Sequence, residues 1–180
     1  MNPASNAPHF AEHSFDRFEL RVELQGPCET YSEKARSRIT QSVFINGKNI
    51  APENSIDLID LSKSCQLSGE FFIVTCGCGE AGCAGIYDGI RVTHFDDRIM
   101  WEVPDPLAHL GLSDEEVEQL GEDRVYKQFS FESQAYLLAV EEGLRIAKGF
   151  LFCDKQPVEC SPYGMAPERL LTLDPLVFSE

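Results

Sequence analysis

The sequence predicts an α+β fold, in which an antiparallel β-sheet of about five to seven strands carries one main amphipathic helix packed on a face. Two observations lead to this prediction. Segments of strand-like sequence follow one another from residue 18 to residue 131 and are joined by short turns, not by regular helices, which favours antiparallel pairing. A single long segment, residues 133–151, instead repeats its apolar residues at helical spacing.

The first two predicted strands are residues 18–24 and residues 39–45. In the first, apolar and charged residues alternate, as in a strand with one buried face, and the pattern stops at Gly26. The second runs into Asn46-Gly47, a pair that favours a two-residue hairpin turn. The chain is therefore expected to turn back on itself directly after residue 45.

Three further elements are predicted from local patterns. Residues 52–64 fit either a short helix capped by Ser55 or a strand. The apolar, β-branched run over residues 70–76 predicts an inner strand of the sheet. Residues 125–131 predict another strand, and Lys127 interrupts its apolar face, which indicates a position near a sheet edge.

The strongest strand signal is a hairpin formed by residues 90–95 and 98–103, with its turn at Asp96-Asp97. One register satisfies both faces of the pair, because it sets apolar residues opposite apolar residues and a positive charge opposite a negative one. The pairs that it predicts are Val92 with Trp101, Ile90 with Val103, His94 with Ile99, and Arg91 with Glu102.

The main helix is predicted over residues 133–151. Its start has two candidate caps, Ser130 and Ser133, and Glu141 and Arg145 are spaced for a helical ion pair. The apolar stripe that is expected to face the sheet consists of Leu137, Val140, Leu144, Ala147 and Leu151.

The chain is expected to form a single domain with two extensions. Residues 1–13 form a flexible N-terminal tail, residues 14–155 form the α+β domain, and residues 156–180, which contain four prolines, form a C-terminal extension packed on the surface. The N-terminus lacks the basic start and apolar stretch of a secretory signal, and no segment approaches the roughly 18 apolar residues that span a bilayer. A cytoplasmic location, where thiols stay reduced, is therefore expected.

The net charge restricts the classes of partner. The chain has 30 Asp and Glu residues against 15 Lys and Arg residues, which gives a formal charge of -15. Such a surface repels nucleic-acid backbones and anionic membranes, and it attracts basic proteins. The same acidity also serves solubility alone, so both interpretations of the charge stay open.

Three cysteines within eight residues, Cys76, Cys78 and Cys83, form the candidate site. They follow the predicted inner strand directly, and thiolates gathered so closely are soft ligands of the kind that zinc prefers. Backbone amides of such a loop can donate hydrogen bonds to sulfur. The positive φ angles that ligand loops often need are permitted by the intervening glycines Gly77, Gly79 and Gly82.

A tetrahedral zinc site needs a fourth ligand. His94 is the nearest imidazole and is the candidate, although the predicted hairpin places it on an apolar face and about 13 Å from Cys76. Cys153 and Cys160 are alternatives because both are free to fold back from distant positions, and Asp88 is a weaker choice.

Other interpretations of the cysteine loop stay open. The thiols are also explained as buried reduced cysteines in a tight turn, or as a redox or disulfide site. No Lys or Arg lies between Gly69 and Ile90 to lower a thiol pKa, so catalysis by a free thiolate is poorly supported. The loop also matches G-x-G-x-x-G, but residues 84–89 predict turn and strand, not the helix that nucleotide binding requires.

The cysteine loop and the hairpin after it carry a resemblance. The segment C-x-C-G-x-x-x-C over residues 76–83, followed by a β-hairpin that ends in Trp101, resembles a group of small uncharacterised bacterial proteins. The resemblance covers residues 70–103 and implies a bacterial, cytosolic origin. That group has no known activity, so the resemblance implies no catalytic residues.

These features together predict a cytosolic, acidic binding protein that is not an enzyme and that engages a basic protein partner, for example as a toxin-neutralising protein. Its predicted structural zinc is held by Cys76, Cys78, Cys83 and His94. The alternative is a metal- or thiol-dependent enzyme centred on the same loop, with Glu80 or His94 as the proton carrier. The two differ in whether the site is closed by four protein ligands or is open beside a pocket.

Overall fold

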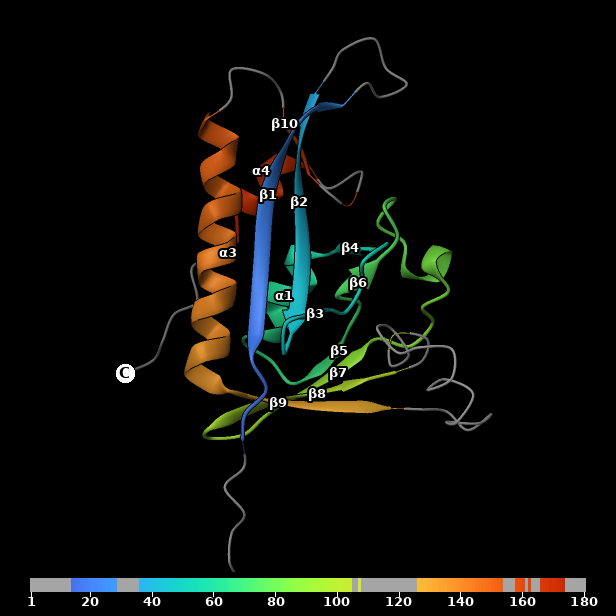
Figure 1. Ribbon diagram of the computed structural model, residues 1–180, viewed down its shortest axis with the longest axis vertical. Helices are drawn as coiled ribbons and strands as arrows, with labels where there is room; N and C mark the ends of the chain where they lie inside the picture. The colour runs from blue at the N-terminus through green and yellow to red at the C-terminus, as the bar shows by residue number, and fades with distance from the viewer. Residues whose placement is uncertain are drawn as a thin grey trace, which may run out of the picture.

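Two four-stranded β-sheets and one long helix dominate the structure (Figure 1), which confirms the predicted α+β class. The computed structural model describes residues 14–28, 36–104, 107, 126–153, 158–160, 162 and 166–173 of the 180-residue chain. The predicted tail over residues 1–13 lies outside these residues. Within this part of the chain, none of the helices combines the length and the apolar character needed to cross a bilayer.

The first sheet has the strand order β1-β2-β10, with β3 added beside β2. Its long strands are β1 (Phe18–Cys28) and β2 (Arg36–Ile45), which pair antiparallel. The predicted first strand is present and is longer than expected, because it continues past Gly26. A register shift between Gln25 and Cys28 accommodates this extension.

A tight turn follows β2, as predicted. β3 (Lys48–Asn49) returns beside β2 after Asn46-Gly47. Both turn residues have positive φ angles, 52° at Asn46 and 80° at Gly47, which a two-residue hairpin turn of this kind requires. The prediction that the chain turns back directly after residue 45 is confirmed.

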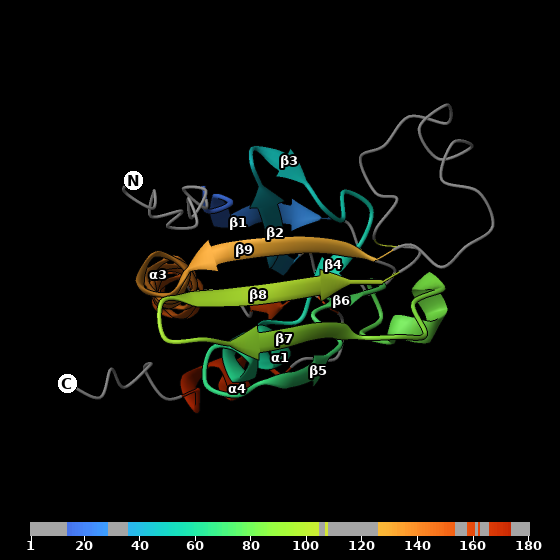
Figure 2. The same cartoon turned by 90° about the horizontal axis from the view of Figure 1, so that it is seen from below.

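The second sheet has the order β5-β7-β8-β9 and is antiparallel throughout. Figure 2 shows these four strands side by side, with the first sheet crossing behind them. Among the described strands, β9 pairs only with β8 and forms one edge, as the interruption of its apolar face by a lysine indicates. The strands of this sheet are β5 (Gly69–Phe71), β7 (Ile90–His94), β8 (Arg98–Val103) and β9 (Lys127–Glu132).

A third, small sheet pairs β4 (Ser55–Ile56) with β6 (Val74–Thr75). The strands predicted as one antiparallel sheet are thus distributed over three sheets. Residues 52–64, which fit a helix or a strand, contain both, because β4 leads into α1 (Leu58–Ser64). Ser55, the predicted helix cap, lies in β4, and the cap falls two residues later.

The hairpin of β7 and β8 has the predicted register. Val92 stands opposite Trp101 and Arg91 stands opposite Glu102, with 3.3 Å between the guanidinium and carboxylate groups of the second pair. The amide of Phe95 donates a hydrogen bond of 2.8 Å to the carbonyl of Arg98, which closes the turn where it was expected. Complementary pairs on both faces thus specified the alignment.

The predicted inner strand over residues 70–76 is divided. Phe71 pairs with Ile90 of β7, but the chain then leaves the second sheet and continues as β6 in the small one. At the break, the amide of Phe72 donates a hydrogen bond of 3.2 Å to Oδ2 of Asp60. A side chain thus satisfies the backbone group that a neighbouring strand would otherwise have bonded.

The predicted main helix is present as α3 (Ser133–Cys153). It begins differently from the prediction, because Glu132 and not a serine caps it: its carboxylate accepts hydrogen bonds of 3.1 and 2.6 Å from the amides of residues 134 and 135. Arg145 bonds Glu142 through two hydrogen bonds of 2.6 and 2.7 Å, in place of the predicted pair with Glu141.

The apolar face of α3 packs on β1, as Figure 1 shows. Val140, Leu144 and Ala147 of the predicted stripe are buried. Gly143 lies directly against Leu20 of β1, and a Cβ atom added at Gly143 would be 2.8 Å from Cγ of Leu20. The helix therefore approaches the strand as closely as it does because this position has no side chain.

The C-terminal residues contribute to the core. β10 (Val158–Cys160) runs parallel to β2 and extends the first sheet. α4 (Pro167–Leu171) buries Leu170 completely. The described parts of residues 156–180 therefore supply a strand and a core side chain, where the sequence predicted an extension lying on the surface.

Aromatic side chains join the two sheets to the helix. Phe18 of β1, Trp101 of β8, Phe131 of β9 and Tyr136 of α3 form one cluster, with ring centroids 4.6 to 5.8 Å apart. Trp101, Phe131 and Tyr136 have at most 1% of their surface exposed. Because edge-to-face and stacked contacts are specific in geometry, this cluster fixes how the sheets cross.

Candidate functional site

The candidate site is the loop that leaves β6 after Thr75 and leads to β7. Its first turn is closed by a hydrogen bond of 2.9 Å from the amide of Gly79 to the carbonyl of Cys76, and Gly79 has a φ of 93°. A 3-10 helix, η1 (Ala81–Ala84), follows and is ended by Gly85 with a φ of 76°. Of the glycines predicted to take positive φ angles, only Gly79 does so. A single turn of 3-10 helix is not the helix that the nucleotide motif requires.

The loop brings the sulfur atoms of Cys76, Cys78 and Cys83 within 4.8 Å of one another. Cys76 is half-buried, and the other two side chains are exposed. A tetrahedral zinc ion with Zn–S bonds of about 2.3 Å holds its sulfur ligands about 3.8 Å apart. A group of three sulfurs this close is therefore able to hold a metal ion.

Two of these sulfurs are joined to each other. Cys76 and Cys78 form a disulfide, and their Cα atoms are 5.4 Å apart, within the usual range for this bond. The amide of Cys78 also donates a hydrogen bond of 3.2 Å to Sγ of Cys76, as expected from an amide-rich loop. Cysteine binds metal ions as a thiolate. The group of three therefore binds a metal only after the disulfide has been reduced to two thiols, which takes two electrons and two protons, for example from a dithiol.

His94, the predicted fourth ligand, lies apart from the three cysteines. Its Nε2 is 2.8 Å from the carbonyl oxygen of Ser64. The predicted strand pairing placed Cys76 near Ile90, whereas in the structure Phe71 takes that place. The cysteine loop therefore begins beyond the end of β5, and His94 lies at the opposite end of β7. The structure does not bring His94 into the group of possible metal ligands.

Of the other predicted ligands, the two whose side chains the structure describes, Cys160 and Asp88, do not complete the group. Cys160 is buried in β10, and the side chain of Cys153 lies outside the described residues. Asp88 is not among the residues whose ligand atoms lie within 4.8 Å of one another. Burial raises the pKa of the Cys65 thiol to about 12. Burial, together with the charge of Glu168, raises the pKa of the Cys160 thiol to about 11. These two thiols are therefore poor nucleophiles and poor ligands at neutral pH.

A pocket of about 400 Å³ adjoins the cysteine loop. The first turn of α1, the end of β6 and the segment between Cys78 and Cys83 form its walls. Three carboxylates and two aromatic rings line it, and no Lys, Arg or His does so among the residues that the structure describes. The side chains that characterise it are Asp57, Asp60, Phe72, Thr75, Glu80 and Tyr87.

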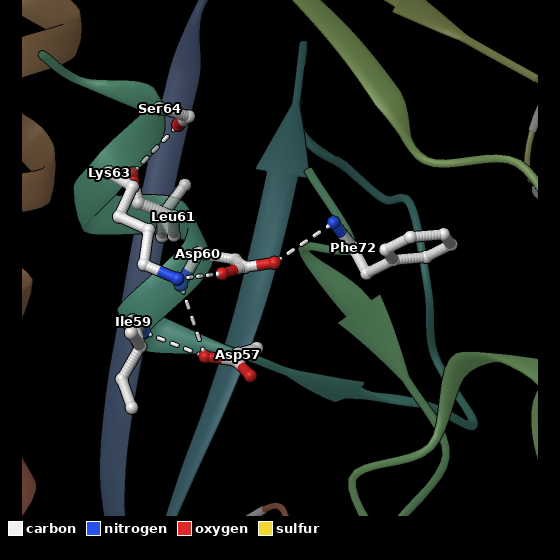
Figure 3. A network of polar contacts seen from close by, with 7 residues as sticks. All are labelled: Asp57, Ile59, Asp60, Leu61, Lys63, Ser64 and Phe72. Carbon is white, nitrogen blue, oxygen red and sulfur yellow. Dashed lines mark hydrogen bonds and ion pairs between the residues drawn. The ribbon is translucent and has the colours of Figure 1, made fainter. Parts of the chain in front are cut away.

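Figure 3 shows how two of the carboxylates are held. Asp57 caps α1, because its Oδ1 accepts hydrogen bonds from the amides of Ile59 (2.7 Å) and Asp60 (3.2 Å). One oxygen of Asp60 bonds Nζ of Lys63 at 2.7 Å, and the other accepts from the amide of Phe72. The backbone thus fixes both carboxylates at the junction of α1 and the strand segment that leads to the cysteines.

Thr75 and Glu80 complete the polar lining. Thr75 is only 2% exposed, and its Oγ1 has no hydrogen-bond partner among the described residues. Glu80 is exposed, and it precedes η1 without capping it through its side chain. The sequence did not predict this pocket, because the pocket forms only when α1 packs beside the loop. The one local signal is the spacing of Asp57 and Asp60 at the start of a helix.

Comparisons of the chain with protein-family models, with curated proteins and with solved structures find no match. The resemblance to small bacterial proteins that share the C-x-C-G-x-x-x-C segment therefore stays a prediction. The function of the site has to be inferred from its own geometry and charge.

Proposed function

We propose that this chain is a cytoplasmic, acidic binding protein that is not an enzyme and that engages a basic protein partner, as a toxin-neutralising protein would. The observation that carries the proposal is the acid-lined pocket beside the cysteine loop, in a chain with a formal charge of -15. An acidic surface speeds association with basic proteins and rejects anionic partners. The net charge supplies attraction at long range, and the pocket supplies a place for close contact.

A zinc ion bound by the thiolates of Cys76, Cys78 and Cys83 is the second part of the proposal. Three sulfurs within 4.8 Å favour a soft metal, and zinc held by three protein ligands takes its fourth ligand from water or from a partner. The amide-to-sulfur hydrogen bond inside the loop supports this, since such contacts tune thiolate ligands. The ion would fix the loop that forms one wall of the pocket.

Association with basic proteins at two salt concentrations tests the binding function. The reduced protein is titrated calorimetrically against a panel of basic proteins, and against acidic proteins of similar size as controls, at about 50 mM and about 300 mM salt. At least one basic protein should bind, and its affinity should fall at the higher salt because exposed charges are screened. If no basic protein associates in a salt-sensitive way, the proposed binding function is wrong.

Elemental analysis combined with thiol counting tests the metal. Protein purified under reducing conditions should contain one zinc per chain, and a chelator should release it and make three more of the seven cysteines reactive. Cys83→Ser should lose the ion, whereas Cys160→Ala, which changes a buried thiol in β10, should keep it. A metal-free protein whose thiol count does not respond to the chelator would contradict the zinc proposal.

Two observations favour a second candidate, a metal- or thiol-dependent enzyme centred on the same loop: the disulfide between Cys76 and Cys78, and the position of three ligands without a described fourth one beside an open pocket. In that function the two thiols reduce a substrate disulfide to two thiols and become the disulfide themselves. Glu80, which lines the pocket, would carry the proton, because His94 is engaged with Ser64. Reduction of a small disulfide by the metal-free protein, abolished in Cys78→Ser, would favour this enzyme over the binding protein.

A further inference from the structure

We infer that the pocket beside the cysteine loop receives one cationic side chain, a lysine ammonium or an arginine guanidinium, from the partner. That the partner is a basic protein rests on the proposed function. The match between the pocket and an organic cation rests on the pocket itself, which is lined by two carboxylates without a neutralising cation among the described residues, by a threonine whose buried hydroxyl lacks a partner, and by two exposed aromatic rings.

Two of the three carboxylates in the pocket have unused capacity. Asp60 is satisfied, because Lys63 and the amide of Phe72 occupy both of its oxygens. Asp57 uses only Oδ1 to cap α1, and no described residue donates a hydrogen bond to its Oδ2. Glu80 forms no ion pair with any Lys or Arg of the described chain. The pocket therefore carries negative charge that a cation would neutralise.

Thr75 is a second, independent indication of a ligand. It lines the pocket, and only 2% of its surface is exposed. Its Oγ1 nevertheless has no hydrogen-bond partner among the described residues. Buried hydroxyl groups are nearly always hydrogen-bonded, so this hydroxyl is a polar group of the cavity wall that a bound group can satisfy once the side chain turns toward it. An ammonium or guanidinium N–H can supply that hydrogen bond.

Aromatic rings make the pocket suitable for the stem of a long cationic side chain. Tyr87 is 79% exposed and Phe72 is 38% exposed, although large aromatic side chains are usually covered. A cation over an aromatic face gains electrostatic energy, and the methylene stem of lysine or arginine packs on apolar surface. The cavity of about 400 Å³ has room for such a side chain together with bound water.

A bare divalent metal is a poorer occupant than an organic cation. Metal ions draw carboxylate oxygens into one tight group, whereas Asp57, Asp60 and Glu80 do not form such a group within 4.8 Å in the described structure. An organic cation distributes its N–H donors over several ångströms and suits acceptors that are spread around a cavity. The spacing of the acidic side chains thus selects the class of ligand.

A titration followed by NMR tests the inference. The probes are three end-blocked pentapeptides that differ only at the central position, which is lysine, arginine or norleucine. The lysine or arginine peptide should shift the backbone amide signals of Thr75, Gly79, Gly82 and Tyr87, and the norleucine peptide should not. Equal binding of the norleucine peptide, or shifts confined to other parts of the chain, would overturn the inference. Comparison of the two cationic peptides identifies the preferred side chain.

Matched variants separate the pocket from the general acidity of the protein. Asp57→Asn keeps the helix cap, because Asn caps as well as Asp, and removes the charge. Together with Glu80→Gln it should weaken peptide binding roughly tenfold, as expected for the loss of charge-assisted hydrogen bonds. Glu23→Gln removes one charge at an exposed position of β1, outside the pocket, and should leave the affinity within about twofold. Equal effects of these variants would refute a specific pocket.

Substitutions of Thr75 test the pocket without changing its charge. Thr75→Val keeps the shape of the side chain and removes the hydroxyl, whereas Thr75→Ser keeps the hydroxyl. Cation binding should weaken severalfold in the valine variant and be retained in the serine variant. Thermal unfolding of both variants shows whether the fold is intact. Unchanged cation binding in a folded valine variant would remove Thr75 from the site.

The same variants distinguish failure of this inference from failure of the proposed function. If a basic protein binds in a salt-sensitive way and the change at Asp57 and Glu80 weakens it no more than Glu23→Gln does, the pocket inference is wrong and the proposed function stands. If the peptides bind in the pocket but no basic protein associates, the pocket inference stands and the proposed function is wrong. If neither binds, both are wrong.

Discussion

Burial divides the cysteines whose side chains the structure describes into two chemical kinds. Cys65 donates to a helix carbonyl and Cys160 lies inside the first sheet, and burial raises the pKa of both thiols. Cys78 and Cys83 are exposed in the loop. Thiol chemistry therefore belongs to the loop, where it either makes a disulfide or supplies metal ligands, while the buried thiols act as small apolar side chains.

Alkylation of the reduced, metal-free protein checks this division. Iodoacetamide at pH 8 should modify Cys83 at least about a hundred times faster than Cys65 or Cys160, because a thiol with a pKa of about 11 is about one-thousandth ionised at that pH. Peptide mass mapping at successive times gives the rates. The buried thiols should react at comparable rates only after unfolding. Similar rates in the native protein would show that Cys65 and Cys160 are accessible.

Tyr136 should make the protein less stable as the pH rises in the alkaline range. Burial raises the pKa of its hydroxyl well above the usual value, so the folded state keeps a proton that the unfolded state loses. Its stabilising contribution is present below a pH of about 10, the usual pKa of tyrosine, and is lost as the pH rises further. Urea unfolding between pH 7 and pH 11 should show the decline, and Tyr136→Phe should reduce it. At pH 7 that variant should cost about 1 kcal/mol, through the lost hydrogen bond to Ser64.

The residues of the candidate site were predictable only where the sequence brings them together. Cys76, Cys78 and Cys83 lie so close in sequence that one loop gathers them, whatever the rest of the fold does. His94 was predicted only as the imidazole nearest in sequence, and the pairing of β5 with β7 leaves it at the end of β7 that is far from the cysteine loop. Thr75 joins the pocket through a contact between segments that are separate in sequence, and no local pattern signals such a contact.

At the level of elements, the contact between α3 and β1 depends on a glycine. Gly143 lets the helix approach Leu20, and this approach closes the core beneath the first sheet. Glycine normally weakens a helix interior, by about 1 kcal/mol relative to alanine. Its presence here shows that close packing outweighs helix propensity at this position.

Two alanine substitutions in α3 test this balance. Gly143→Ala should destabilise the protein by about 1–3 kcal/mol, because the added methyl overlaps the side chain of Leu20 and the helix has to shift. Gly149→Ala, on an open and exposed part of the same helix, should stabilise it by up to about 1 kcal/mol. Urea unfolding gives both values. A stabilised Gly143→Ala protein would show that the helix does not depend on this contact.

The elements that were predicted correctly are specified by patterns within their own sequences. The β7–β8 register follows from matched pairs on both faces, and α3 follows from a stripe of apolar residues. The division of residues 70–76 between two sheets was not predictable, because it depends on Asp60 of α1 replacing a strand partner. β10 was missed because three residues pair only when a strand far away in sequence is already in place.

For the molecule as a whole, the proposed zinc should contribute directly to the free energy of folding. The ligands come together only in the folded loop, so binding favours the native state. Zinc at about 100 times its dissociation constant should raise the free energy of unfolding of the reduced protein by about 2.7 kcal/mol. Trp101, the single Trp, is buried, so its fluorescence reports the transition.

Variants of two cysteines are the controls for this measurement. Cys83→Ser should lose the stabilisation by zinc, and Cys160→Ala should retain it, because only the first removes a proposed ligand. An equal gain in Cys83→Ser would mean that zinc acts elsewhere on this acidic chain. A chelator should return the wild-type protein to the stability of its metal-free form.

The parallel pairing of β10 with β2 has a consequence for how the protein is made. Val158 pairs with Ser37, so the two partners leave the ribosome about 120 residues apart. Throughout that interval, the backbone groups of β2 that await β10 are open to any other extended chain nearby. The nascent polypeptide must therefore shield this edge, or have a chaperone shield it, until β10 has been translated.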